Sequence, residues 1–289
     1  MNVIEASNLC KNYGKDIGIK NINLQIEQGE VFGFIGPNGA GKSTFIRTLM
    51  GFLLPSSGTA SILGQSIDKD LHDIRKKIGY LPSEVNYYDG MSSRELLEYH
   101  AGFYDNVNRD KINTLGALFE LDLDRKIEAL SFGNKKKCAI IQSVLHAPEL
   151  LILDEPTSGL DPLMQNRFFE LLEEESKKGT TIFFSSHILT EIQRMCNRAA
   201  IIRKGEINAV EDIQSLLTKQ MKKARFIFKE KTELSFIEGI QNTVWMNNKL
   251  TFDYVGPVSN LILWMGTLDL VDAVLEEPDL ETIFMNYYQ

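Results

Sequence analysis

A short apolar segment followed by a glycine-rich loop constrains this chain more than any other feature. Val31–Ile35 is apolar throughout, which is typical of a strand buried on both faces of a parallel sheet. The loop Gly36-Pro-Asn-Gly-Ala-Gly-Lys-Ser43 follows directly, and a helical pattern begins near Lys42. A buried strand, a tight loop and a helix in this order predict an α/β fold with a mainly parallel sheet.

The loop matches the pattern G-x-x-x-x-G-K-[ST], in which glycines let the backbone come close to an anion. Its N–H groups and the helix N-terminus present positive charge to phosphates. Lys42 adds a full charge, and the Ser43 hydroxyl can ligate Mg²⁺. The alternative is a glycine-rich turn without a ligand. We favour a nucleotide phosphate site formed by Gly36, Pro37, Asn38, Gly39, Ala40, Gly41, Lys42, Ser43 and Thr44.

A second apolar segment, Leu150–Leu153, ends in the acids Asp154 and Glu155. A buried strand end is a costly place for two carboxylates unless each has a partner or a function. Strand alternation predicts that one acid faces a metal ion and the other an attacking water. The alternative for Asp154 is a helix N-cap. Because Mg²⁺ keeps most of its waters, Ser43 and Asp154 would suffice as protein ligands.

The sequence pattern divides the chain into a domain at residues 1–218 and a smaller one at 219–289. In the first domain, apolar strands alternate with helices, and residues 92–147 are mostly helical by period. Residues 219–223 form a basic stretch that we interpret as a linker. The remainder predicts a small α+β appendage, with strands at 225–229 and 271–275, a hairpin of 244–246 and 250–254, and helices at 258–265 and 280–288.

Charge, cysteines and hydropathy exclude several classes of protein. With 31 Lys and Arg against 39 Asp and Glu, the net charge is −8, so holding a nucleic-acid backbone by charge alone is not expected. The three cysteines are an odd number without metal-ligand spacing, which favours free thiols in a reducing compartment. No signal-peptide pattern and no apolar run of membrane-spanning length is found. We expect a cytoplasmic protein that reaches the membrane through a partner.

Six segments, in this order along the chain, match motifs of one family: Tyr13, Gly36–Thr44, Leu130–Asn134, Leu150–Glu155, Ser158–Asp161 and His187. The chain therefore resembles the nucleotide-binding subunits of ABC transporters, and the resemblance covers residues 2–217. It implies a P-loop NTPase fold with a helical subdomain at about 85–147, ATP and Mg²⁺ as cofactors, and ATP hydrolysis. It also implies a role for each matching residue: adenine stacking by Tyr13; phosphate binding by Gly36–Thr44; catalysis by Glu155, His187 and Lys42; metal binding by Ser43 and Asp154; and contacts to ATP across a subunit interface by Ser131, Gly133 and Asp161.

Two motifs depart from the family pattern. Ser83 stands where the family carries a glutamine that contributes to the metal or water site, and serine has a shorter reach. In Leu130-Ser-Phe-Gly-Asn134, at the family's signature position, Phe132 and Asn134 replace glycine and glutamine. Ser131 and Gly133 remain and precede a predicted helix, whose N-terminus suits a phosphate.

The resemblance implies a head-to-tail homodimer or heterodimer of such subunits, coupled to a separately encoded integral membrane permease. Residues 276–284 and the appendage resemble ATPases that serve ABC-2 type exporters of peptides or drugs, with the phenol-soluble-modulin type as the nearest example. Residues 92–147 and the segment after Tyr80 would contact the permease. The alternatives are a soluble ABC-type ATPase acting on ribosomes or DNA, and a nucleotide-dependent regulator that hydrolyses ATP weakly.

Several smaller features favour structural interpretations. Lys135-Lys-Lys137 is expected to be a solvated helix turn rather than a nucleic-acid patch. The histidines His72, His100 and His146 have no motif around them, so surface or core positions are expected. The apolar cluster at 261–265, which contains Trp264, predicts appendage core rather than a membrane contact.

Overall fold

The computed structural model describes residues 1–69, 72–87, 89–105, 107–213, 221–230 and 234–276. The chain divides into two compact units, Met1–Val210 and Glu211–Gln289, which are described separately below. The boundary expected after residue 218 lies outside the described residues.

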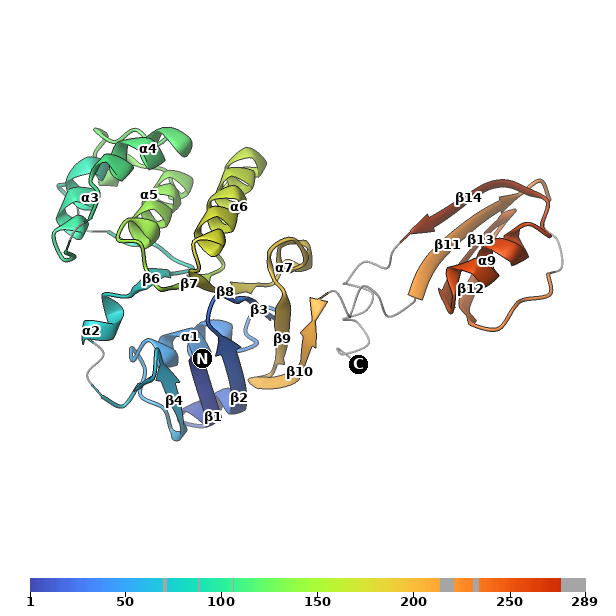
Figure 1. Cartoon of the computed structure of the whole chain (residues 1–289), viewed down its shortest axis with the longest axis horizontal. Coiled ribbons are helices and arrows are strands. Elements are labelled where there is room, and N and C mark those ends of the chain that lie inside the picture. Colours follow the sequence, from blue (N-terminus) through green and yellow to red (C-terminus); the bar gives the residue numbers. More distant parts are fainter. Residues whose placement is uncertain (70–71, 88, 106, 214–220, 231–233, 277–289) are drawn as a thin grey trace. The chain divides into compact units, whose positions relative to one another are not determined.

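A six-stranded sheet forms the centre of the N-terminal unit (Figure 1). Neighbouring pairs among β6, β7, β8, β3 and β9 are parallel, and Ile35 of β3 pairs with Ser186 of β8 while Asp154 of β7 pairs with Ser185. The carboxyl ends of these strands therefore meet at one edge, where α/β sheets bind their ligands. The order is β10 (Glu206–Asp212), β9 (Arg198–Arg203), β3 (Val31–Ile35), β8 (Thr181–Ser186), β7 (Leu150–Asp154) and β6 (Ile78–Leu81).

An antiparallel four-stranded sheet packs against the other face of helix α1 (Lys42–Leu49), which contacts both sheets. Its order is β2 (Asp16–Glu27), β1 (Asn2–Tyr13), β4 (Ser57–Ile62) and β5 (Gln65–Ser66). Phe34, Phe45 and Phe183 meet in the shared core, with ring centroids 5.1 to 5.9 Å apart. Strand β1 extends to Tyr13 because it forms a long hairpin with β2, and this extension brings Tyr13 close to Thr44 at the start of α1.

The predicted helical region consists of α3 (Ser93–Ala101), α4 (Asp110–Leu118), a 3₁₀ turn at Ile127–Ala129 and α5 (Phe132–Val144). In Figure 1 these helices lie on the opposite side of the central strands from the four-stranded sheet. Helix α6 (Pro162–Lys177) follows β7, and α7 (Leu189–Met195) follows β8, while α2 (His72–Arg75) precedes β6. Serine or aspartate side chains cap the starts of α3, α5 and α6, which is why these helices begin where they do.

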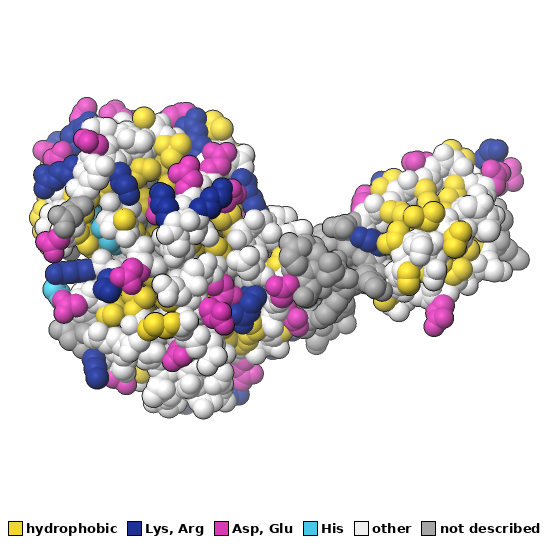
Figure 2. All heavy atoms as spheres, viewed as in Figure 1, with side chains coloured by type: hydrophobic (Ala, Val, Ile, Leu, Met, Phe, Trp, Pro, Cys, Tyr) yellow, Lys and Arg dark blue, Asp and Glu magenta, His cyan; other side chains and the backbone are white. Residues whose placement is uncertain are grey.

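The C-terminal unit has an antiparallel sheet in the order β12 (Ile240–Met246), β13 (Lys249–Val255), β11 (Met221–Phe228) and β14 (Leu270–Glu276). Helix α9 (Val258–Met265) packs on it through Leu261 and Trp264. These strands and α9 confirm the expected α+β character and the core position of Trp264. The outer side of α9 exposes Leu263 by 73% and Ile262 by 56%, and Figure 2 shows hydrophobic side chains gathered on this unit.

The linker expected at 219–223 is wrong for its last residues, because Met221, Lys222 and Lys223 begin β11. Lys223 pairs across the strands with Glu276 and with Asp253, so opposite charges stabilise a strand end that looks like a basic linker in sequence. The helix expected at 280–288 lies outside the described residues. None of the helices in the described ranges is long and apolar enough to cross a membrane.

Candidate nucleotide-binding site

The glycine-rich loop runs from β3 into α1 and leaves no room for a side chain at Gly36 or Gly41. Gly39 and Gly41 have φ angles of 79° and 108°, a region that favours glycine. A Cβ on Gly41 would lie 2.6 Å from the carbonyl oxygen of Gly18, and a Cβ on Gly36 would collide with the carbonyl of Ile202. Glycine at these positions is what allows the backbone of the loop to follow this path.

Lys42 is buried, with 6% of its surface exposed, although it carries a full charge. Its Nζ donates hydrogen bonds to the carbonyl oxygens of Gly36 at 2.6 Å and Pro37 at 3.2 Å. The same Nζ lies 3.1 Å from Glu155 Oε1. The lysine thus connects the phosphate loop to the acid at the end of β7.

Asp154 and Glu155 face different partners. Asp154 is fully buried, and its Oδ1 accepts a hydrogen bond from Ser185 Oγ at 2.7 Å. Glu155 points instead to Lys42 and to His187, whose Nδ1 lies 2.7 Å from Oε2. Strand alternation does not explain this difference, because β7 ends at Asp154 and Glu155 has a φ of 48°. A left-handed glutamate is strained, and such strain is concentrated at functional sites.

A cavity of about 310 Å³ brings residues of the predicted phosphate loop together with Glu155, whereas Asp154 does not line it. Asp154 Oδ2 and Glu155 Oε1 are buried and accept no hydrogen bond from the described residues. Glu155 Oε1 is paired with Lys42, whereas Asp154 Oδ2 has no partner among the described residues, and carboxylate and hydroxyl oxygens are the hard donors that Mg²⁺ prefers. The residue set therefore fits a magnesium nucleotide. The lining residues are Ile17, Gly18, Asn38, Gly39, Gly41, Lys42, Ser43, Thr44, Ser83 and Glu155.

Tyr13 lies beside this cavity without lining it. A Cβ on Gly18 would lie 2.8 Å from Tyr13 Cε2 and 2.9 Å from Thr44 Cγ2, so the ring edge is close to the start of α1. The ring is 47% exposed, and Lys11 Nζ lies 5.5 Å from its centroid. An exposed aromatic face next to a phosphate loop is suited to stacking on the adenine ring of a nucleotide.

Ser131, Gly133 and Asp161 do not line the cavity. Ser131 caps α5, and its Oγ accepts from the N–H of Asn134; Asp161 caps α6, and its Oδ1 accepts from the N–H of Met164. A Cβ on Gly133 would lie 2.7 Å from the carbonyl oxygen of Gly159, in the loop before α6. The signature segment therefore packs against the Ser158–Asp161 segment of its own chain, away from its own phosphate loop.

Comparison with known proteins identifies the family. Residues 19–158 match the model of the family described as ABC transporter. The bacitracin transport ATP-binding protein BcrA of Bacillus licheniformis is 35% identical over 71% of this chain and 68% of that protein. The chain belongs to the ABC transporter ATP-binding proteins. Its N-terminal unit is an ABC-type ATPase.

An uncharacterized ABC transporter ATP-binding protein of Nostoc, all4389, is 37% identical over 71% of this chain, which spans 63% of the Nostoc protein. Among solved structures, an ATP-binding subunit of an ABC transporter superposes with a TM-score of 0.69 and 29% identity. That match covers 74% of this chain and 91% of the other. These comparisons confirm the P-loop fold of the ABC type.

One lysine of this ABC protein corrects the sequence interpretation. Lys136 was expected in a solvated helix turn, yet it is fully buried, and its Nζ donates to the carbonyl oxygens of Pro82 at 2.9 Å and Ser83 at 3.2 Å. The helical period contains a signal for this position, because Lys136 precedes the buried Ile140 and Val144 by four and eight residues. Lys135 and Lys137 are partly exposed.

A second buried network of the ABC protein has no motif that could have revealed it. Glu191 of α7 accepts hydrogen bonds from Thr157 Oγ1 and from Ser186 Oγ, both at 2.6 Å. Burial raises the pKa of Glu191. Since Thr157 follows the acids and Ser186 precedes His187, this carboxylate joins the two segments on either side of the Glu155–His187 contact.

Proposed function

We propose that this chain is the ATP-hydrolysing subunit of an exporter, and that it powers a separately encoded integral membrane permease. The observation that carries the proposal is the position of Glu155. Its carboxylate lies between the Lys42 ammonium and the His187 ring at the wall of the phosphate cavity. A carboxylate that contacts both a cation and a histidine ring beside a phosphate cavity supports a catalytic role for Glu155.

The residues divide the chemistry among them. Glu155 orients and polarises the attacking water as a general base. Lys42 and His187 stabilise the charge that develops on the transferred phosphate. Ser43 and Asp154 would hold Mg²⁺, with Ser83 near enough to the cavity to contribute, and the ion would neutralise charge on the phosphates.

The signature segment supports a head-to-tail dimer, either with a second copy or with a different ABC ATPase. Ser131 and Gly133 lie outside the cavity of their own chain, and Ser131 heads the 13-residue helix α5. A helix N-terminus is suited to a phosphate, so in the proposed dimer it faces the ATP of the partner subunit. Asp161, which caps α6 nearby, would line the same interface.

A groove of about 440 Å³ in the N-terminal unit is the proposed docking place of the permease. It lies where the segment after β6 passes the helices α3 and α5, and it includes the ring pair Phe52 and Tyr80. A cytoplasmic loop of the permease would enter it and hold the ATPase at the membrane surface. The name of the bacitracin transport relative supports export of a peptide or a drug. The most specific substrate class that we propose is a peptide of the phenol-soluble-modulin type.

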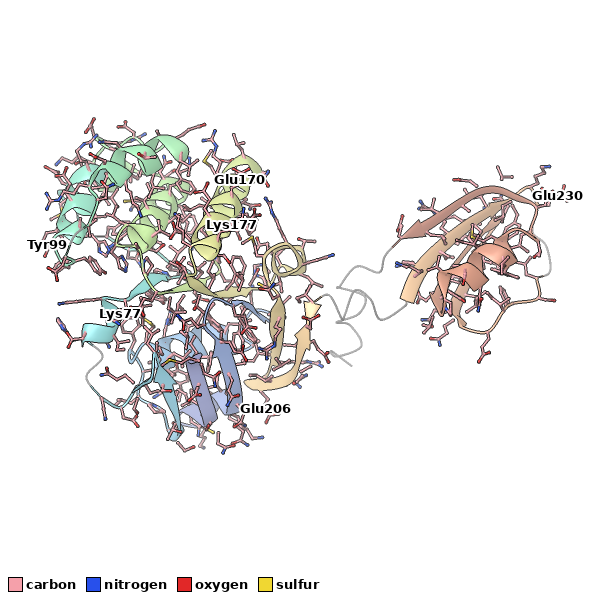
Figure 3. All side chains as sticks on the ribbon, in the orientation of Figure 1. Lys77, Tyr99, Glu170, Lys177, Glu206 and Glu230 are labelled. Carbon is pink, nitrogen blue, oxygen red and sulfur yellow. The ribbon has the colours of Figure 1, made fainter. Side chains whose placement is uncertain are left out.

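The test is Glu155→Gln in the full chain. Gln has nearly the same shape but cannot accept the proton at neutral pH, so phosphate release should fall by a factor on the order of 10²–10⁴. Mg·ATP binding should persist, and the closed dimer should accumulate on size-exclusion chromatography because ATP stabilises it. Glu170→Gln is the matched control, since Glu170 is an exposed residue of α6 (Figure 3) and does not line the cavity.

Unchanged turnover in Glu155→Gln would remove Glu155 from the mechanism. Wild-type protein that binds ATP but releases no phosphate, even with the permease present, would favour a nucleotide-dependent regulator instead. Ser83 in place of a longer side chain at the cavity wall is the observation that makes this outcome worth testing.

A further inference from the structure

Lys136 carries a completely buried charge near the ATP cavity. It lies in the second turn of α5, five residues after Ser131, and none of its surface is exposed. Both partners of its Nζ are main-chain oxygens, of Pro82 and Ser83, and it forms no ion pair with the residues that the structure describes. The contact joins segments 54 and 53 residues apart in sequence.

An ammonium in this position is expensive, because a buried charge loses its hydration. Burial lowers the pKa of Lys136 to about 8, and the charges of Asp154 and Glu155 oppose that change. Two charge-assisted hydrogen bonds and two acids at longer range therefore hold the cation in place. A leucine or methionine would fill the same space without this cost, so packing alone does not explain a lysine.

The oxygens that Lys136 holds belong to the wall of the cavity. Ser83 lines the cavity together with Lys42 and Glu155, and it follows β6, which pairs with β7. Lys136 contacts neither the phosphate loop nor Tyr13, and it does not line the cavity. Its direct contacts with the site are therefore those to the Pro82-Ser83 segment, while its charge acts on Asp154 and Glu155 at longer range.

We propose that Lys136 is a positioning residue that fastens the Pro82-Ser83 wall of the ATP cavity to α5, the helix that carries Ser131 and Gly133. The proposal rests on the proposed function and adds a physical link within it. One end of α5 serves the ATP of the partner subunit, and its second turn holds the wall of the chain's own ATP cavity. Movement of the helical subdomain thereby shifts Ser83 relative to Glu155.

The experiment compares three variants of the full chain: Lys136→Met, Lys136→Gln and Lys135→Met. Methionine keeps the apolar stem and removes the donors, glutamine keeps an N–H donor group without the charge, and Lys135 is the partly exposed neighbour that serves as control. Phosphate release is measured against ATP concentration to separate kcat from KM, and thermal unfolding is measured in parallel.

Lys136→Met should lower kcat about tenfold or more, because small misplacements of a cavity wall have effects of that size, while KM for ATP and the unfolding temperature change little. Lys136→Gln should regain most of the lost kcat, and Lys135→Met should behave as wild type. Unchanged kcat in Lys136→Met would overturn the proposal. So would a parallel loss of thermal stability, or a Gln variant as slow as the Met variant.

A second measurement does not depend on hydrolysis. Hydrogen exchange of the peptide 79–87 should be faster in Lys136→Met than in wild type, with and without Mg·ATP, because the fastened segment is released. Exchange in Lys135→Met should be unchanged. Equal exchange in Lys136→Met and wild type would overturn the proposal even if the chain proved not to hydrolyse ATP. Failure of the Glu155→Gln test would, in contrast, count against the proposed function alone.

Discussion

The two units of this protein both have apolar cores, but they differ in the charged side chains that they bury. The N-terminal unit buries Lys42, Lys136, Asp154 and Glu191, whereas the buried residues described in the C-terminal unit are apolar or aromatic. The polar atoms that its core does contain are satisfied by main-chain oxygens: Tyr254 donates to Pro257, and Trp264 donates to Ser235.

The difference in buried charge indicates which unit carries the nucleotide chemistry. Buried charges destabilise a fold unless they are paired, so a domain keeps them where chemistry needs them. In the N-terminal unit Lys42 lines the cavity and Lys136 contacts a segment of its wall, whereas the buried Glu175 pairs with Lys178 near the end of α6. The core described for the C-terminal unit is apolar, so we expect mutations in it to change stability and those around the cavity to change nucleotide chemistry.

Phe226→Ala should give the largest effect and should stay within the C-terminal unit. Phe226 is fully buried and its ring contacts Phe252 and Trp264, with centroids 5.0 and 5.9 Å away. Its truncation should lower the free energy of unfolding by about 3–5 kcal/mol. Denaturant unfolding followed by Trp fluorescence would measure this, with Phe236→Ala as control, since Phe236 is 46% exposed. A matching loss of ATP affinity would show that the core of the C-terminal unit also affects nucleotide binding.

Lys42→Ala should lower the affinity for ATP and leave the stability of the fold nearly unchanged. Removing a charged hydrogen-bond donor from the phosphates should weaken ATP binding roughly 10²-fold, while the fold survives. Titration with a fluorescent ATP analogue measures the affinity. Lys77→Ala is the matched control, because Lys77 is an exposed lysine of the same unit, paired with Glu149 (Figure 3). Wild-type affinity in Lys42→Ala would contradict the site.

The stability of the N-terminal unit should fall between pH 6.5 and 4. Burial lowers the pKa of His100 and of His146 to about 4, so in this window the unfolded chain takes up protons that the folded chain does not, and folding becomes less favourable as pH falls. Each ring contributes less than about 1.4 kcal/mol per pH unit, since both are partly exposed.

Thermal unfolding at pH 7 and pH 5 tests this sign. His146→Gln should weaken the dependence of stability on pH, because Gln does not take up a proton in this range. The variant should still fold, since the Gln amide can donate to the carbonyl oxygen of Ile78, which lies 3.2 Å from His146 Nε2. His72→Gln should not, because His72 is exposed. Equal stability of the wild-type unit at both pH values would show that these imidazoles already bind protons in the folded state.

Removal of the C-terminal unit should give the smallest effect. A chain ended after Thr218 keeps the phosphate loop, both acids and His187, so its ATP affinity should match that of the full chain. Isothermal titration with Mg·ATP compares the two. A soluble shortened chain that binds no nucleotide would show that the second unit supports the nucleotide site, and that the two units do not have separate roles.

Local sequence predicted much of the fold and the centre of the site. The apolar segments at Val31–Ile35 and Leu150–Leu153 are strands of the parallel sheet, and the glycine loop lies where expected between β3 and α1. Such features depend on neighbouring residues, because burial on both faces and positive φ angles leave signals within a few positions. The roles of Tyr13, Ser131, Gly133 and Asp161 in ATP binding stay predictions.

The contacts of the buried charges were decided only by the tertiary structure. Nothing near Lys136 in sequence indicates that its ammonium meets the carbonyls of Pro82 and Ser83, and the end of β7 at Asp154 is what turns Glu155 toward Lys42 and His187. The physical reason is that sequence sets which groups are charged, whereas segments distant along the chain supply the partners that make burial of a charge possible.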